Sequence, residues 1–235
     1  MYIDQAIRWS LIEKHLPSAP LSIFEVGCGS GEFLLHLTAK GYTTSGCEPQ
    51  TDVLSYKAEL KNLVIQANGT AIPLPADSVD CTVSSDVLEH VQPGDRRKFI
   101  QEMLRITKPG GFIVCTVWVR LTLSFRLMGC LYLLRWGRLP AWYIEHITIR
   151  PPTLSEISDL LREGAVLIKV QPYHSAVGHI TAGLQHVLLK PNSRACKLAT
   201  ALSAFASTLD IFGANGSCLY VARKPLPQRL SNSGI

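Results

Sequence analysis

Three glycines at alternate positions directly follow a short apolar run in "IFEVGCGSGEF", residues 23–33. Glycine is costly inside regular structure, so a cluster of it marks a backbone that bends sharply or approaches another group closely. The residues before the cluster are typical of a buried strand, and those after it are typical of a helix. The stretch therefore predicts a strand, a tight turn at Gly27, Gly29 and Gly31, and then a helix.

Strand-like and helix-like segments alternate along the remaining chain. The expected strands cover 21–26, 43–48, 62–66, 79–84, 111–118, 165–171 and 217–223, and the expected helices cover 4–16, 30–40, 50–59, 94–106, 153–162 and 194–211. Strands that alternate with helices of this length indicate a mostly parallel sheet covered on both faces. We therefore expect a doubly wound α/β fold with a mostly parallel, seven-stranded sheet. Ligands of such folds bind outside the carboxyl ends of the strands, where the glycine-rich turn lies.

Composition excludes several other classes of protein. Hydrophobic residues make up 47% of the 235 residues and charged residues 17%, which is typical of a globular chain. The seven cysteines are odd in number and scattered without CxxC spacing, so we expect reduced thiols, no disulfide framework and no metal site. The N-terminal 20 residues lack an uninterrupted apolar core and predict an amphipathic helix, not a signal peptide. We expect a cytoplasmic protein.

Two phosphate-binding motifs fail to match the glycine-rich turn. A dinucleotide fingerprint needs G-x-G-x-x-G, but the third glycine position is Glu32, whose carboxylate would repel a pyrophosphate. A P-loop is excluded because no Gly-Lys-Ser/Thr follows. The turn suits a cofactor without phosphate, whose amino-acid moiety lies against bare backbone.

An ordered series of motifs resembles the class I S-adenosylmethionine-dependent methyltransferases. The first is "EVGCGSG", which matches the family's acidic residue followed by G-x-G-x-G. It is followed by "GCEPQ", "ANGTAIPLPADSVD", "VSSDVLEHV" and "RITKPGGFIV", in the family's order and spacing. The resemblance spans about residues 20–120 and implies the Rossmann-like methyltransferase fold, with S-adenosyl-L-methionine as methyl donor.

The resemblance implies a set of cofactor-binding residues. They are Glu25, Gly27, Cys28, Gly29, Gly31, Glu48, Asn68, Gly69 and Asp86. Glu48 stands 21 residues after Gly27, close to the separation of about 20 at which a carboxylate takes ribose hydroxyls. Asn68 replaces the family's usual aspartate near the adenine amino group; an amide can still accept that hydrogen bond, so we expect slightly weaker cofactor binding. Asp86 either lines the site or caps the next turn.

A catalytic base is required only if the methyl acceptor must lose a proton. His146, His174 and His179 lie beyond the cofactor half of the chain. His146 is the preferred candidate because it follows the insertion expected to cover the site, and His90 is a second candidate. Each histidine is also explained by a surface or packed position, and Glu89 and His90 by a structural role, so the base stays open.

The segment 119–150 carries most of the net charge of the chain. With Trp118 it contains Arg120, Arg126, Arg135, Arg138 and Arg150, one acid, Glu145, and the tryptophans Trp136 and Trp142, among leucine and phenylalanine. Basic residues interleaved with tryptophan and leucine are typical of a helix in a membrane interface. The same pattern also fits a lid that buries its apolar surface over the pocket. Both interpretations suit an apolar methyl acceptor.

The expected organisation is a single methyltransferase domain over 1–223. It comprises a cofactor-binding core at 18–118, the basic-apolar lid insertion at 119–150, a helical insertion at 172–216 before the last strand, and a disordered tail at 224–235.

The chain resembles most the small-molecule, quinone-biosynthesis-like branch of the family. We expect methyl transfer to a small or lipid-like acceptor, with membrane contact through 119–150 at the inner face. The alternatives are a catalytically silent cofactor-binding subunit and, with less support, a nucleic-acid methyltransferase. The basic residues are embedded in apolar ones, so no nucleic-acid partner is expected. The acceptor, its nucleophilic atom and the oligomeric state stay open.

Overall fold

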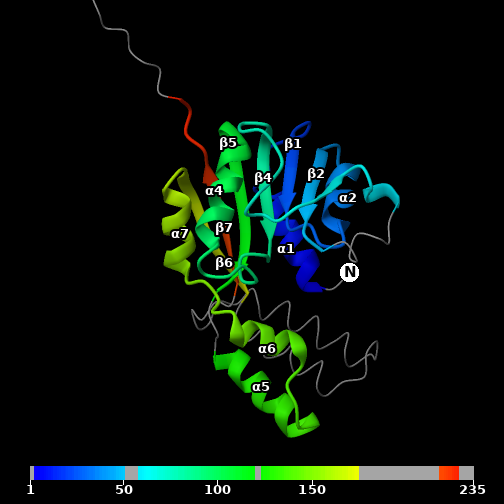
Figure 1. The fold of residues 1–235 in the computed structure, drawn as a ribbon, viewed down its shortest axis with the longest axis vertical. Coiled ribbons are helices and arrows are strands. Elements are labelled where there is room, and N and C mark those ends of the chain that lie inside the picture. Colours follow the sequence, from blue (N-terminus) through cyan, green and yellow to red (C-terminus); the bar gives the residue numbers. More distant parts are fainter. Residues whose placement is uncertain (1–2, 51–57, 120–122, 175–216, 228–235) are drawn as a thin grey trace, which may run out of the picture.

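The computed structural model describes residues 3–50, 58–119, 123–174 and 217–227. Its strands form one seven-stranded sheet with helices on both sides (Figure 1). The strands are β1 (Ser22–Val26), β2 (Thr43–Glu48), β3 (Val64–Gln66), β4 (Val79–Ser85), β5 (Thr107–Trp118), β6 (Val166–His174) and β7 (Ser217–Arg223). The α-helices are α1 (Ile3–Glu13), α2 (Glu32–Ala39), α4 (Arg96–Ile106), α5 (Leu123–Trp136), α6 (Ala141–Thr148) and α7 (Leu154–Arg162). All seven predicted strands are confirmed.

The strand order is β3-β2-β1-β4-β5-β7-β6. The pairs from β3 to β5 are parallel, whereas β7 runs antiparallel between β5 and β6. The doubly wound, mostly parallel α/β sheet is therefore confirmed. β1, β2, β4 and β5 end at one edge, which we call the carboxyl edge. The strand order reverses between β1 and β4, and ligands of such sheets bind in the crevice at that point.

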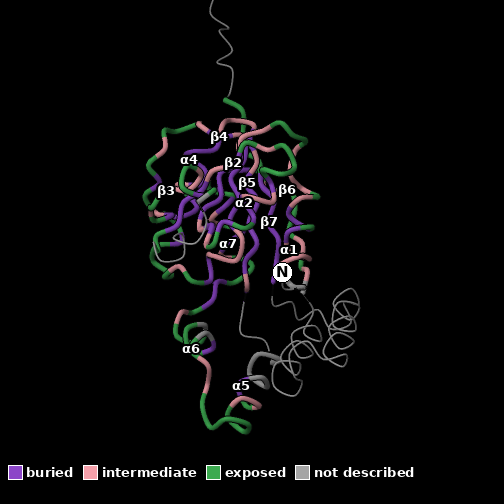
Figure 2. Tube along the Cα trace, turned by 90° about the vertical axis from the view of Figure 1, so that its right-hand side faces the viewer, coloured by how far each residue is buried: buried purple, intermediate pink, exposed green. Residues whose placement is uncertain are grey.

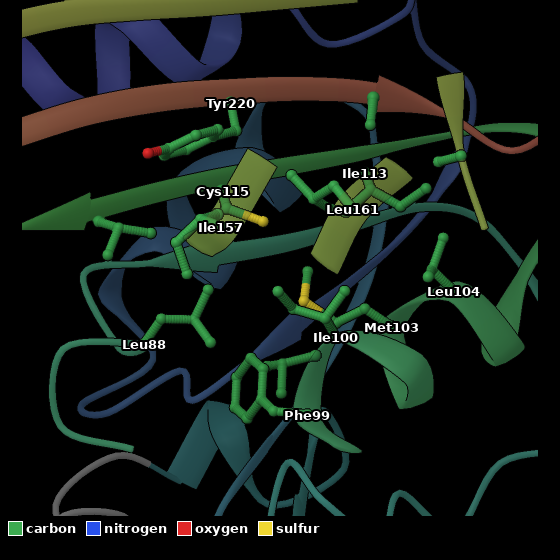
Figure 3. Close-up of a cluster of buried hydrophobic side chains, with 14 of the residues drawn as sticks. Leu88, Phe99, Ile100, Met103, Leu104, Ile113, Cys115, Ile157, Leu161 and Tyr220 are labelled. Atoms are coloured by element: carbon green, nitrogen blue, oxygen red, sulfur yellow. The ribbon is translucent and has the colours of Figure 1, made fainter. Parts of the chain in front are cut away.

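Two apolar clusters, one on each face, hold the helices to the sheet. On one face, α4 and α7 pack on the central strands through side chains that include Phe99, Met103 and Leu161 (Figure 3). On the other face, α1 and α2 pack through Trp9 and Phe33, whose ring centroids are 5.2 Å apart. A sheet covered on both faces must direct its ligand site to an edge.

The start of β5 differs from the one expected. α4 ends at Ile106, and β5 begins at once at Thr107, four residues before the predicted start at 111. The "KPGG" run joins the strand because Gly110 N–H donates to the Lys224 carbonyl and Lys224 N–H donates to the Gly111 carbonyl. The same two bonds order Lys224, the first residue of the expected disordered tail.

Three other expectations fall wholly or partly outside the described residues. Residues 51–57 of the predicted helix 50–59 lie outside the described residues, and Ala58–Leu60 forms a 3-10 turn. The predicted helix 194–211 lies outside the described residues. Of the expected insertion 172–216, only the first three residues are described, and they belong to β6.

Residues 123–148 form a hairpin of two helices, α5 and α6, which we call the α5–α6 hairpin. It lies beyond the carboxyl edge of the sheet, separate from the layers of the body (Figures 1 and 2). Gly129 on α5 leaves room for Tyr143 on α6, because a Cβ at Gly129 would lie 2.2 Å from the Tyr143 hydroxyl oxygen. Among the described helices, none has the length and apolar character needed to cross a bilayer.

Candidate cofactor and acceptor site

The glycine-rich turn is folded against the end of β2. The N–H groups of Gly27 and Cys28 both donate to the Cys47 carbonyl, at 2.9 and 3.0 Å. Gly27 has φ +77°, and a Cβ there would lie 2.7 Å from a methyl carbon of Val87. Only glycine fits this position, because the turn needs a left-handed backbone pressed against a side chain.

Gly29 marks the open side of the turn. A Cβ at this position would meet no atom within 4 Å among the described residues. Its N–H donates to Glu48 Oε2 at 3.0 Å, and Gly31, two residues on, ends the turn as the N-cap of α2. Backbone that faces open space beside a carboxylate is a surface on which a polar ligand can lie closely.

Glu48 closes this side of the site from the end of β2. Its side chain is buried, and its second oxygen, Oε1, accepts from the Gln50 N–H at 3.2 Å. These bonds fix the carboxylate between the first turn and the end of β2, where the resemblance places the ribose contact. The contact itself stays a prediction.

Glu25 lies buried on β1 just before the turn. One of its oxygens, Oε2, has no hydrogen-bond partner within the described part of the chain. Burial raises the pKa of Glu25 to about 8; the Arg8 guanidinium opposes this shift and the Glu48 carboxylate adds to it. A buried carboxyl group with an unused oxygen leaves a hydrogen-bonding position open to a ligand or to a water molecule.

Asn68 and Gly69 follow β3, where the adenine contact was expected. Asn68 Oδ1 accepts from both the N–H and the hydroxyl of Thr70, each at 3.0 Å. A Cβ on Gly69 would lie 2.3 Å from the Phe99 ring and 2.7 Å from Val26, so packing alone requires this glycine. The adenine contact of this pair stays a prediction.

Asp86 directly follows β4 in a left-handed conformation, φ +54°. Its N–H donates to the carbonyl and the hydroxyl oxygen of Thr116, at 3.0 and 3.1 Å. Its carboxylate accepts from Arg8 Nη1 on one oxygen and from the Tyr173 hydroxyl, at 3.1 Å, on the other. Asp86 therefore joins α1 and β6 at the carboxyl edge. Sequence reasoning missed Arg8 and Tyr173, because neither stands in a local motif.

Glu89 lies in the same region, although its sequence context suggested a structural role. Its side chain is only 4% exposed; Oε1 accepts from the Trp118 N–H at 3.4 Å, and Oε2 has no partner among the described residues. Burial, and then the nearby Asp86 carboxylate, raise the pKa of Glu89 well above its usual value. The hydroxyl oxygens of Ser84 and Ser85 on β4 are likewise buried without partners in the described chain.

Glu25, Asp86 and Glu89 form what we call the carboxylate cluster, around the single guanidinium of Arg8. Only one partly buried cation faces three carboxyl groups, so the cluster is short of positive charge; it favours a cationic ligand and disfavours a phosphate. S-adenosylmethionine carries a sulfonium and an ammonium group and no phosphate. The open backbone at Gly29 and the unused carboxyl oxygens therefore fit this cofactor.

The histidines expected as candidate bases are not gathered at the cluster. His90 Nδ1 lies 3.0 Å from Glu145 Oε1, which links the loop after β4 to the α5–α6 hairpin. His146 belongs to α6 and His174 ends β6, but their side chains are outside the described part of the structure, as is all of His179. The catalytic role of His146 stays a prediction.

Comparison with known proteins supports the resemblance. The methyltransferase-domain family model matches residues 24–115. An uncharacterised methyltransferase of Mycolicibacterium vanbaalenii is 41% identical over 108 residues, covering 43% of this chain and 41% of that protein. An Arabidopsis thaliana tRNA (carboxymethyluridine(34)-5-O)-methyltransferase is 30% identical over 145 residues, covering 59% of this chain and 33% of that protein. The chain thus spans less than half the length of these relatives.

Solved structures share the fold at low identity. The Streptomyces coelicolor geranyl diphosphate C-methyltransferase, solved with Mg²⁺, geranyl diphosphate and S-adenosyl-L-homocysteine, has a TM-score of 0.62 and 13% identity, with 94% of this chain and 80% of that chain covered. A putative methyltransferase in complex with the Haloferax volcanii Trm112 methyltransferase activator has a TM-score of 0.61 and 16% identity, with 96% and 92% covered. Identities this low support the fold alone.

The glycine-rich turn, the position of Glu48, the strand order and the matched family model agree with one another. The glycine-rich turn and Glu48 both lie within the residues that the family model matches. Residues 24–115 therefore match a methyltransferase domain, in agreement with the class I S-adenosylmethionine-dependent methyltransferases that the motifs resemble.

Proposed function

We propose that the protein transfers a methyl group from S-adenosyl-L-methionine to a small or lipid-like acceptor at the carboxyl edge. The observation that carries this proposal is the carboxylate cluster beside the open backbone of Gly29. A buried excess of carboxyl groups stabilises a cationic donor, and it disfavours the nucleotide phosphates that other doubly wound folds bind.

Each residue then has a defined part in holding the reactants. Glu48 and the Gly29 backbone hold the nucleoside side of the donor, while Glu25 and Arg8 lie toward its charged amino-acid side. The donor supplies a methyl group already activated on a sulfonium, so the protein must mainly keep donor and acceptor in line and exclude water. Such positioning supplies up to about 7–11 kcal/mol of a reaction barrier.

The acceptor side of the proposal rests on the α5–α6 hairpin. The hairpin lies beyond the same edge at which the cluster is found (Figure 1), and it carries exposed leucine, isoleucine and tryptophan side chains. This arrangement supports an apolar acceptor and contact of segment 119–150 with a membrane. The cytoplasmic face as the place of that contact is part of the proposal. The small-molecule branch of the family is part of the same proposal.

Two other functions have a specific observation in their favour. The Arabidopsis relative acts on tRNA by its name, which supports an RNA acceptor as the second candidate. The Haloferax structure, which shares the fold, is a complex of a putative methyltransferase with an activator protein. It supports the alternative that this chain needs a partner protein for turnover.

Calorimetric titration with S-adenosylhomocysteine, with and without detergent-solubilised lipid extract, tests the donor. Micromolar binding is expected, and no binding in either condition would contradict the proposal for the isolated chain. Incubation with methyl-labelled S-adenosylmethionine and either lipid extract or total tRNA then separates the acceptors. Label in the lipid fraction supports the proposal, whereas label only in tRNA selects the second candidate.

A further inference from the structure

The tip of the α5–α6 hairpin exposes large apolar side chains. Leu134 is 84% exposed, Leu133 49% and Trp136 44%, and on α6 Ile144 and Ile147 are also exposed. The hairpin has its own internal contact at Gly129 and Tyr143, so these exposed residues are not needed to hold its two helices together. Exposed apolar residues gathered on one projecting element mark an interaction surface.

Cations alternate with these apolar residues. The tip reads "LLRWGR" from Leu133 to Arg138, and every residue in it is exposed. It contains two arginines and no acid. The guanidinium of Arg135 lies 5.5 Å from the Trp136 ring centroid, so the cation and the aromatic ring form one amphipathic unit. Arginines that flank tryptophan and leucine at a helix end suit the boundary between acyl chains and anionic headgroups.

A cavity of about 380 Å³ lies between the tip and the start of α6. It is lined by Tyr132, Trp136, Arg138, Leu139, Pro140 and Ala141. Tyr132 and Trp136 are in ring contact, with centroids 4.9 Å apart, and Arg138 is the charged group of the lining. One cation among aromatic and aliphatic walls matches a phosphate attached to an apolar chain.

The hairpin connects directly to the candidate site. His90 follows Glu89 in the chain and contacts Glu145 of α6, and Arg150, just after α6, offers its carbonyl to Arg96 at the start of α4. Both views show the hairpin below the carboxyl edge (Figures 1 and 2). A surface bound to the tip therefore lies at the same end of the molecule as the carboxylate cluster.

We propose that the hairpin tip docks on an anionic lipid bilayer. Leu133, Leu134 and Trp136 enter the headgroup–acyl boundary, Arg135 binds lipid phosphates at the surface, and Arg138 binds one headgroup phosphate in the cavity. Charge complementarity selects this occupant over a second copy of the chain, since two such tips would repel each other. The idea that the docked membrane also supplies the methyl acceptor rests on the proposed function. The docking itself does not rest on it.

Flotation of the purified full chain with phosphatidylcholine vesicles, with and without phosphatidylglycerol, tests the surface. The wild-type protein is expected to float with the anionic vesicles and much less with the neutral ones. Leu134→Ser should reduce anionic binding at least tenfold. Joint replacement of Arg135 and Arg138 by Gln should remove the preference for the anionic lipid.

Leu226→Ser is the matched control, because Leu226 is also a strongly exposed leucine, 68%, but lies beside Gly110 near the start of β5, away from the carboxyl edge. It should float like the wild type. Equal flotation of the Leu134→Ser variant and the wild type, or no flotation of the wild type, would overturn the proposal. Binding of labelled tRNA that the arginine variant loses, without vesicle binding, would assign the tip to RNA instead.

Calorimetry with S-adenosylhomocysteine on the same samples keeps the two proposals apart. The tip variants should retain cofactor affinity, because no residue of the tip belongs to the carboxylate cluster. Flotation without cofactor binding would reject the proposed function and leave the docking surface in place.

Discussion

Burial governs the ionisation of Glu25 and Glu89. Each has one oxygen with no partner among the described residues, and each has a raised pKa because the charged form is poorly solvated. Arg8 already shares its guanidinium with Asp86. A cation that enters the cluster therefore supplies the charge that these two groups lack.

Cofactor binding should consequently release protons near neutral pH. With its pKa at about 8, Glu25 is mostly protonated at pH 7 in the free protein, and a bound sulfonium favours the ionised form. Affinity for S-adenosylmethionine should rise with pH up to about 8, and less steeply for S-adenosylhomocysteine, which lacks the sulfonium. Calorimetry in two buffers of different ionisation heat measures the released protons. Glu25→Gln should reduce the number of protons released on binding. An undiminished number of released protons would exclude Glu25 as their source.

Glu48→Ala should weaken S-adenosylmethionine binding at least tenfold, because it removes the carboxylate that Gly29 and Gln50 hold at the end of β2. Calorimetry gives the affinity, and circular dichroism should show an intact fold. Glu59→Ala, at an exposed acid in the nearby 3-10 turn, is the control and should bind normally. An unchanged affinity for Glu48→Ala would remove Glu48 from the site.

At the scale of the elements, Arg96 joins three segments near the carboxyl edge. It is fully buried at the start of α4. Its guanidinium donates to the Val91 carbonyl at 3.1 Å, to Glu156 on α7 at 2.9 Å, and to the Arg150 carbonyl after the hairpin. Glu156 is also the N3 residue of the capping box whose N-cap is Thr153. One side chain thus fixes where the hairpin rejoins the body.

Arg96→Met should lower the free energy of unfolding by about 3–5 kcal/mol, because it leaves two carbonyls and a carboxylate without their buried donor. Urea denaturation measures the change. Arg97→Met is the matched control: Arg97 is the next residue, is 60% exposed and pairs with Glu163 at the surface. Its effect should stay within about 0.5 kcal/mol. Similar losses of unfolding free energy for both variants would contradict the structural role of the buried Arg96 contacts.

At the scale of the molecule, the predicted cofactor-binding residues and the hairpin tip occupy separate parts of the chain. Glu25, Glu48 and the glycine turn belong to the first two strands and their connections, whereas the tip follows β5. Cofactor binding should therefore stabilise the body whether or not the tip is altered. A ligand at 100 times its dissociation constant adds about 2.7 kcal/mol to the stability of the native state.

S-adenosylhomocysteine at that concentration should raise the melting temperature by roughly 5–11 °C for a chain of this size. Leu134→Ser should show the same rise as the wild type, and Glu48→Ala a much smaller one at the same ligand concentration. Differential scanning calorimetry measures all three. Loss of the rise in Leu134→Ser would mean that the hairpin completes the cofactor site, as a lid would.

The local sequence pattern was sufficient to predict the strands of the sheet and the glycine-rich turn. The apolar runs and the glycine triplet predict β1, its turn and α2, because strand burial, positive φ and helix periodicity act over a few residues. The spacing from Gly27 to Glu48 likewise places both at adjacent strand ends in a parallel sheet. The start of β5 escaped prediction, since "KPGG" becomes a strand only through pairing with Lys224, more than 110 residues away.

What the sequence by itself determined is therefore the doubly wound fold and the chemistry of the donor side, both carried by short-range motifs. Only the tertiary structure brought Arg8 and Tyr173 to Asp86, buried Glu89, and left the hairpin tip exposed. The physical reason is the distance along the chain over which each interaction acts. Backbone conformation is decided by neighbours in the chain, whereas burial and charge pairing are decided by residues that meet only after the sheet has formed.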